Sequence, residues 1–320
     1  MSPRTRTWLL VGAIAIVAAA ATVGATLLTR TGTGGTTTAA APKQKGAPEL
    51  DLDLGVRTDT EAVALRRALD LYDRGRRKAA GTAFARYRSL EARVGAALSD
   101  WPDGFDRLAE LERQHPQSSL AQLELGLAFF WQGRLAQAQK AWRAARKAQP
   151  DTYYAIRADD LLHPRDAPGL PPFSPSFPLP PAIANKPFTQ QLAYLAAHAN
   201  TGGARDKLLY GIALQQLHRP VSAERQFAAG ARLAPRDPDA QVAAAVGLFD
   251  KSRPAAAFAK LGPLVRVFPK AITVRYHLGL MLLWIGQFKA SRAQLERVVA
   301  AGPSPFRSDA RLLLSKLGGK

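Results

Sequence analysis

The chain of 320 residues contains no cysteine, and this absence excludes several kinds of chemistry. Without a thiol there is no disulfide, no cysteine-ligated zinc or iron–sulfur centre and no thiol nucleophile. The absence of cysteine does not determine the cellular compartment, because a protein without disulfides can work on either side of a membrane. Apolar residues make up 47% of the chain and charged residues 22%, which is typical of a folded protein.

Sequence signatures of catalysis and metal binding are also missing. The five histidines are scattered, and none forms an H-E-x-x-H or another paired metal spacing. The chain has no G-x-S-x-G, no Walker A loop and no Rossmann fingerprint. The sequence therefore predicts that the protein is not an enzyme and has no catalytic residue, no cofactor and no metal ion.

A long uncharged stretch lies near the amino terminus. Residues 8–28 hold no charged side chain, and 21 residues at about 1.5 Å each span a hydrocarbon layer of roughly 30 Å. We predict a cytoplasmic tail and transmembrane signal-anchor over residues 1–30. Because Arg4 and Arg6 precede the stretch, the C-terminal domain is expected outside the cytoplasmic membrane. A secretory signal cleaved after a small residue is the alternative, although signal apolar regions are usually about 7 to 15 residues long.

The next part of the chain, residues 31–57, is rich in Gly, Thr, Ala and Pro. This composition is typical of a flexible linker, which would tether the C-terminal domain to the membrane segment.

Residue types recur at fixed positions in the rest of the chain. In 34-residue windows that start at 119, 204, 238 and 272, small residues occupy columns 8 and 20, large apolar residues occupy column 24 and proline occupies column 32. Column 8, for example, holds Gly126, Gly211, Ala245 and Gly279. Glycine costs a helix about 0.5 to 1 kcal/mol, so its recurrence predicts a neighbouring helix that passes close by. The proline of column 32 ends the second helix of each window.

This column pattern resembles the tetratricopeptide repeat (TPR) family. The resemblance implies an all-α fold, a TPR-type α-solenoid of antiparallel helix pairs, here preceded by one transmembrane helix and a flexible tether. The solenoid would cover residues 58–318, which leaves no segment for a separate enzyme domain. Its predicted units are repeats near 61–94, 119–152, 204–237, 238–271 and 272–305, a degenerate unit at 95–118, a unit at 153–203 with a proline-rich insert at 163–187, and a capping helix at 306–318. Ser308 is the predicted N-cap of that last helix.

The resemblance also implies where a partner would bind. In TPR proteins the first helix of each unit lines a concave groove through columns 2, 5, 9, 12 and 13. Those columns predict a largely apolar groove for a protein or peptide partner, lined here by Leu123, Leu127, Phe130, Trp131, Leu208, Ile212, Gln215, Val242, Val246, Phe249, Tyr276, Leu280, Leu283 and Trp284. An alternative stays open, in which the chain's own insert, with Phe173, Phe177 and Leu179, lies in this groove.

The excess of basic residues supports a second hypothesis. The chain has 44 Lys and Arg against 25 Asp and Glu, and one basic cluster comprises Arg74, Arg76, Arg77, Lys78, Arg86 and Arg88. Such a cluster could contact anionic lipid headgroups, anionic envelope polymers or nucleic acid. The absence of a recognition motif with stacking aromatics argues against nucleic acid. The sequence thus favours a membrane-tethered TPR scaffold that binds protein partners in bacterial envelope assembly, with a charge-driven adaptor for anionic polymers as the alternative.

Overall fold

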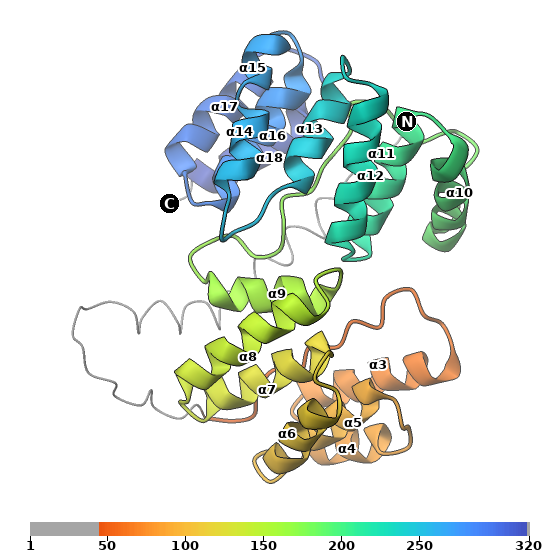
Figure 1. The fold of residues 1–320 in the computed structure, drawn as a ribbon, viewed down its shortest axis with the longest axis vertical. Helices are drawn as coiled ribbons and strands as arrows, with labels where there is room; N and C mark the ends of the chain where they lie inside the picture. The colour runs from red at the N-terminus through yellow and green to blue at the C-terminus, as the bar shows by residue number, and fades with distance from the viewer. Residues whose placement is uncertain (1–44, 319–320) are drawn as a thin grey trace, which may run out of the picture. The chain divides into compact units, whose positions relative to one another are not determined.

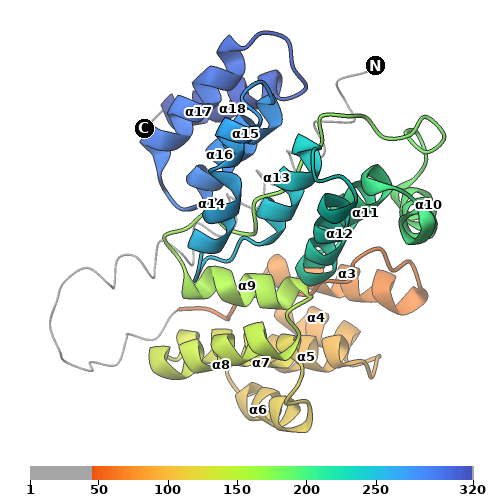
Figure 2. The ribbon, with the colours of Figure 1, turned by 45° about the horizontal axis from the view of Figure 1, so that its top comes forward.

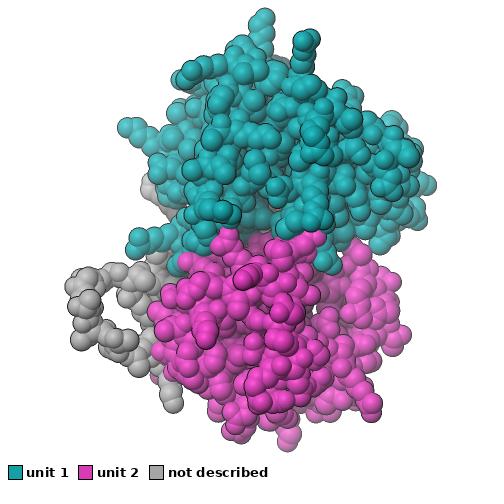
Figure 3. All heavy atoms as spheres, in the orientation of Figure 1, with its two compact units in different colours: residues 1–31, 163–320 teal, residues 32–162 magenta. Residues whose placement is uncertain are grey.

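The computed structural model describes residues 45–318 of the chain. Every regular element in that range is an α-helix, from α3 to α18. The helices divide into two compact units, shown in separate colours in Figure 3. The described part of unit 2 is residues 45–162, and that of unit 1 is residues 163–318.

Unit 2 consists of three helix pairs and one further helix (Figure 1). In each pair the two helices pack on each other, and the first helices also pack on the first helices of neighbouring pairs. The first helices α3, α5, α7 and α9 thereby form one face, which we call the first-helix face of unit 2. The bounds of the helices are α3 (Thr60–Asp73) with α4 (Arg77–Phe84), α5 (Leu90–Ser99) with α6 (Phe105–Gln114), α7 (Ser119–Trp131) with α8 (Leu135–Ala148), and α9 (Tyr153–Leu162).

Unit 1 is built in the same way (Figure 2). Its first-helix face is formed by α11, α13 and α16, which pack on one another in that order. The helices are α10 (Phe188–Thr201), α11 (Ala204–Gln216) with α12 (Pro220–Leu233), α13 (Pro238–Gly247) with α14 (Ala255–Leu261) and α15 (Leu264–Val267), α16 (Ile272–Trp284) with α17 (Phe288–Ala300), and α18 (Arg307–Gly318).

The small residues of column 8 make the pairs fit together. A Cβ atom added to Gly126 would lie 2.4 Å from the indole ring of Trp142, the column 24 residue of the same pair. At Gly211 an added Cβ would lie 2.4 Å from the ring of Phe227, again in column 24. The large residue of the second helix therefore occupies the space left by a missing side chain on the first.

In four helix pairs of residues 45–318 (α3–α4, α7–α8, α11–α12 and α16–α17) a short turn joins the two helices and depends on the residue in column 15. Gly75, Gly133 and Gly286 hold this column with φ values of 75°, 78° and 71°. This left-handed conformation carries no Cβ penalty for glycine. His218 takes the same column between α11 and α12, with φ of 55°, and is the one non-glycine residue with positive φ in residues 45–318. The fold is thus an all-α stack of adjacent helix pairs of TPR-like construction.

Some boundaries of the predicted repeats differ from those of the helices in the structure. The boundary at residue 95 falls inside α5, because Ser89 caps that helix by accepting a hydrogen bond from the backbone N–H of Ala92. The unit predicted at 153–203 is divided, since α9 packs on α8 in unit 2 whereas α10 packs on α11 in unit 1. At the C-terminus α18 begins at Arg307, so Ser308 lies inside its first turn rather than before it.

The predicted membrane segment, residues 8–28, lies outside the described residues. Within residues 45–318, none of the helices has the length and apolar character needed to span a bilayer.

Candidate functional site

The residues predicted to line one groove lie on the first-helix faces of two separate units. Four of them are on α7 in unit 2, and ten are on or directly after α11, α13 and α16 in unit 1. The structure buries Leu123, Leu127, Phe130, Leu208, Val242, Val246, Phe249, Tyr276, Leu280 and Trp284, and leaves Trp131, Ile212, Gln215 and Leu283 partly exposed.

The proline-rich insert, residues 163–187, covers the first-helix face of unit 1. In Figures 1 and 2 the green chain between α9 and α10 follows α13 on its way to α10. The backbone N–H of Ala167 donates to the carbonyl oxygen of Trp284 at 3.0 Å, and the indole N–H of Trp284 donates to the carbonyl oxygen of Gly169 at 3.2 Å. The insert therefore lies on the unit 1 part of the predicted groove, which agrees with the alternative in which the chain's own insert lies there.

Further along the insert, three backbone N–H groups donate to side chains of three different first helices. Phe173 donates to Oε1 of Gln215 on α11, and Ser174 donates to Nε2 of His277 on α16, each at 3.0 Å. Ser176 donates to both carboxylate oxygens of Asp239 on α13, at 3.2 and 3.3 Å, and its hydroxyl also bonds that carboxylate. The face thus binds an extended peptide largely through its main chain.

The ring of Phe173 is the apolar anchor of the insert. It is only 2% exposed, and its centroid lies 5.4 Å from that of Phe227 and 5.1 Å from that of the stacked His277. Phe177 and Leu179, further along the insert, are partly buried. The guanidinium of Arg205 lies 4.9 Å from the centre of the Phe177 ring. Apolar contact and main-chain hydrogen bonds therefore act together.

His277 and Asp239 are buried titratable groups of this face. Nδ1 of His277 lies 2.8 Å from the carbonyl oxygen of Thr273, so the neutral ring carries its proton there and Nε2 accepts from Ser174. Burial lowers the pKa of His277 to about 4, against the opposing effect of the Thr273 carbonyl. Burial also raises the pKa of Asp239, although the hydrogen bonds from Ser176 and Thr273 counteract it.

Unit 2 holds an extended segment on its own first-helix face. Residues 31–57 were predicted to be a flexible linker, but Leu50 and Leu54 are each only 5% exposed and belong to the core of the unit. The linker prediction is therefore wrong for residues 47–57. The sequence does carry a signal, because residues 49–54 alternate acidic residues with leucine, and such alternation is typical of an extended segment with one buried side.

Main-chain groups of this segment bond side chains of α3, α7 and α9. The N–H of Asp51 donates to Oε1 of Glu124 at 2.8 Å, and the N–H of Asp53 donates to the hydroxyl of Tyr154 at 3.0 Å. The hydroxyl of Tyr72 donates to the carbonyl oxygen of Pro48 at 2.6 Å. Both units thus use their first helices in the same way, as a surface that binds an extended peptide.

The predicted basic cluster lies at the α3–α4 turn, along α4 and just after it. Arg74 pairs with Asp70 at 2.8 Å, and Arg77 donates to the carbonyl oxygen of Trp101 at 3.0 Å. The remaining four side chains are exposed and make no ion pair in the part of the chain that the structure describes; they are Arg76, Lys78, Arg86 and Arg88. In the same part of the chain, no group of three or more His, Asp or Glu side chains is arranged to hold a metal ion.

No family model and no curated protein matches the chain. Solved structures that resemble it include the Cut9–Hcn1 hetero-tetramer of APC/C, at 14% identity and a TM-score of 0.35, over 81% of this chain and 49% of that one. The present chain therefore spans about half the length of the chain that it matches there. It also resembles the TPR2AB domain of yeast Sti1 in complex with pHSP90, at 10% identity and a TM-score of 0.32, over 81% and 98% of the two chains. A tetratricopeptide repeat protein from Parabacteroides merdae has 13% identity and a TM-score of 0.32, over 81% and 99%.

These likenesses do not bear on what the protein binds.

Proposed function

We propose that this protein is a membrane-tethered scaffold of TPR-like helix pairs that binds extended segments of protein partners on its first-helix faces. One observation carries the proposal. Three successive first helices of unit 1 each provide one side chain that accepts a hydrogen bond from the main chain of the insert. A surface that already binds a peptide in this way has the chemistry to bind a partner peptide.

The mode of recognition suggests which partners fit. Main-chain hydrogen bonds give affinity without regard to side chains, while the site of Phe173 accepts an aromatic ring between Phe227 and His277. A partner would therefore present an extended stretch with one bulky aromatic residue. To bind, it must displace the insert, whose covalent attachment gives it a local concentration in the millimolar range. Occupancy by a partner thus requires high affinity or an event that loosens the insert.

Membrane tethering is part of the proposal and is supported by the uncharged residues 8–28 and the preceding Arg4 and Arg6. It places the two units outside the cytoplasmic membrane of a bacterium, where they would serve envelope assembly. Carbonate extraction of membranes tests the anchor, and protease treatment of intact spheroplasts tests the orientation. Release by carbonate, or protection of the units in spheroplasts, would contradict this part.

Photo-crosslinking in cells tests the partner site. A photoreactive phenylalanine analogue replaces Ile212, which is partly exposed on α11, in the natural chain and in the variant Phe173→Ala with Ser176→Ala. Loosening the insert is expected to increase crosslinks to other proteins several-fold. The analogue at Arg225, an exposed residue of α12, is the matched control and should not change. Crosslinks to the chain itself alone, in both insert versions, would overturn the proposal.

The second candidate is a charge-driven adaptor for anionic polymers, favoured by the four exposed cations Arg76, Lys78, Arg86 and Arg88. Affinity for vesicles with anionic lipid would then fall steeply as salt rises. Replacing the four cations by glutamine should abolish binding if this function holds. Unchanged binding after that replacement would exclude the cluster as the contact.

A further inference from the structure

The segment bound to unit 2 has a distinctive side-chain pattern. Residues 47–55, which we call the acidic–leucine segment, contain the alternating run Glu-Leu-Asp-Leu-Asp-Leu at 49–54. Leu50 and Leu54 lie in the core of unit 2, and Leu52 packs partly buried against it. Because side chains alternate along an extended chain, the acidic residues point to a different side.

On that side a single arginine pairs with two acidic side chains. Nε of Arg157 on α9 lies 2.8 Å from Oδ2 of Asp51, and its Nη2 lies 2.9 Å from Oε2 of Glu49. The hydroxyl of Tyr153 donates to Oδ1 of Asp51 at 3.1 Å. The side chain of Arg157 is only 9% exposed, so its charge depends on these carboxylates for compensation.

A buried carboxyl group faces the main chain of the segment. Glu124 on α7 is 0% exposed, and Oε1 accepts from the N–H of Asp51. Its other oxygen, Oε2, has no hydrogen-bond partner among the described residues. Burial raises the pKa of Glu124 well above its ordinary value, and the negative charge of Asp51 adds to the effect. A polar group this deeply buried is expected to need the peptide N–H that meets it.

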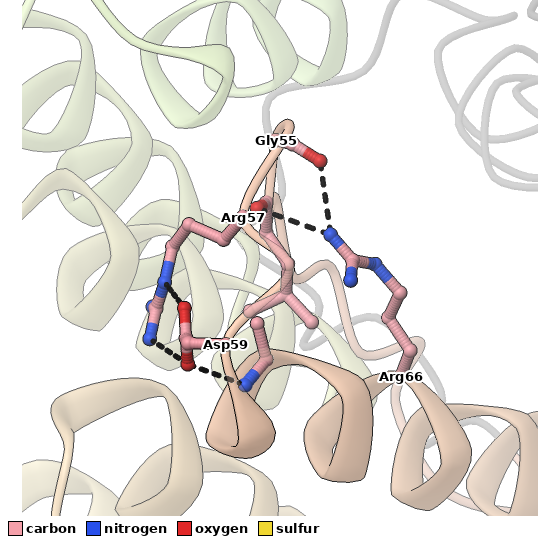
Figure 4. A network of polar contacts seen from close by, with 6 residues as sticks. Gly55, Arg57, Asp59 and Arg66 are labelled. Atoms are coloured by element: carbon pink, nitrogen blue, oxygen red, sulfur yellow. Dashed lines mark hydrogen bonds and ion pairs between the residues drawn. The ribbon is translucent and has the colours of Figure 1, made fainter. Parts of the chain in front are cut away.

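The C-terminal end of the segment is held by a turn, shown in Figure 4. Gly55 has φ of 50°, and the guanidinium of Arg66 donates to its carbonyl oxygen at 3.0 Å. Arg57 pairs with Asp59, and Asp59 accepts from the N–H of Ala62 and thereby caps α3. The segment therefore enters α3 through an ordered turn.

We propose that the first-helix face of unit 2 is a receptor for extended acidic–leucine peptides, which residues 47–55 occupy in the isolated chain and a protein partner supplies in the assembly. Arg157 and Tyr153 select the acidic side chains, and the sites of Leu50 and Leu54 select the apolar ones. Glu124, Tyr154 and Tyr72 bind the main chain. The inference rests on the proposed scaffold function and names the chemistry of its partner: an internal stretch in which acidic residues alternate with leucine.

The test uses the full chain in detergent micelles, with a specific protease site inserted between Val56 and Arg57. Cleavage leaves residues 47–55 held by non-covalent contacts alone, so that they can exchange. The probe is a fluorescent peptide with the sequence of residues 46–56, and its binding is measured by anisotropy. The cut chain should bind the probe at least 100-fold more tightly than the uncut chain, because the intramolecular competitor is lost.

Variants of protein and peptide test the assigned contacts. Arg157→Gln in the cut chain should weaken probe binding at least tenfold, whereas Arg93→Gln, at an exposed arginine of α5, should leave it unchanged. A probe in which serine replaces the residues matching Leu50 and Leu54 should lose binding despite its unchanged charge. A circular dichroism spectrum equal to that of the natural chain establishes that Arg157→Gln still folds.

Three results would overturn the proposal. The first is a probe affinity that Arg157→Gln does not alter, and the second is equal binding of a scrambled probe with the same charge. The third is a dimer of the uncut chain that Arg157→Gln dissociates, since the face would then serve a second copy instead of a partner. If the peptide-binding test on unit 2 fails, the crosslinking result from Ile212 in unit 1 still stands. The scaffold function and the receptor role of unit 2 can therefore be disproved independently.

Discussion

Nε2 of His277 on α16 accepts a 3.0 Å hydrogen bond from the backbone N–H of Ser174 in the insert. The acceptor exists only while the imidazole is neutral, because a proton on Nε2 would point at the N–H it now binds. His277 thus couples the docking of the insert to acidity.

The first prediction concerns pH. The folded pKa of His277, about 4, lies below its ordinary value of 6.5, so the neutral ring contributes stability that is present above pH 6.5 and lost as the pH falls toward 4. We expect urea unfolding of unit 1 to lose about 3 kcal/mol between pH 7.5 and pH 4 through this group. Asp239 acts in the opposite sense, because its raised pKa weakens stability as the pH rises.

Comparison with a variant isolates the histidine. In His277→Gln the loss of about 3 kcal/mol that this histidine contributes between pH 6.5 and pH 4 should disappear. His198→Gln, at an exposed histidine of α10, is the control and should keep it. An identical pH profile for the natural chain and His277→Gln would disprove the coupling.

The second prediction concerns the small residues of column 8. A Cβ at Gly126 would lie 2.4 Å from the Trp142 ring, so Gly126→Ala should destabilise unit 2 by about 1 to 3 kcal/mol through overpacking. At Gly279 the nearest atom is a methyl carbon of Leu295 at 3.1 Å, and a leucine side chain can shift. Since alanine also favours the helix by up to about 1 kcal/mol, Gly279→Ala should change stability by less than about 1 kcal/mol. Thermal unfolding of both variants distinguishes the sites; equal losses would contradict the packing account.

The third prediction concerns the anchor of the insert. Truncation of a buried phenylalanine commonly costs about 3 to 5 kcal/mol, but the insert can detach instead of leaving a cavity. Phe173→Ala should therefore cost no more than the docking free energy of the insert, while trypsin cleavage after Arg165 accelerates at least tenfold. Phe177→Ala, at a partly buried position, should accelerate it less. Equal cleavage rates in the natural chain and Phe173→Ala would rule out Phe173 as the anchor.

The fourth prediction concerns column 20, where Ser291 replaces the alanine of three other repeats. Its buried hydroxyl donates to the carbonyl oxygen of Gly279 at 2.7 Å. Ser291→Ala keeps the packing and removes one hydrogen bond, so a loss of about 1 kcal/mol is expected. Ser291→Leu should cost more, because it overfills the same contact. Urea unfolding measures both; a larger loss for alanine than for leucine would refute the assignment.

Helix positions could largely be predicted from the sequence, because their causes are local. The prolines at 150, 235 and 303 each follow the last residue of a second helix within a few positions, and glycine at column 15 marks the turns. The predicted groove residues lie on first helices, apart from Phe249 just after α13, since their spacing fixes the side of the helix on which they stand. The spacing does not show which segment packs on that side of the first helices.

An all-α chain of paired helices follows from short-range features of the sequence: the prolines of column 32, the turn glycines and the alternation of small and large residues within each 34-residue window. The division of the helices into two units, and the segment of the same chain that lies on each first-helix face, are seen in the folded structure and not in the periodicity. The cause is the separation of the contacting residues along the sequence. Ser174 and His277 are 103 residues apart, and Asp51 and Arg157 are 106 apart, so these contacts depend on the complementarity of distant donors and acceptors, which no local periodicity records.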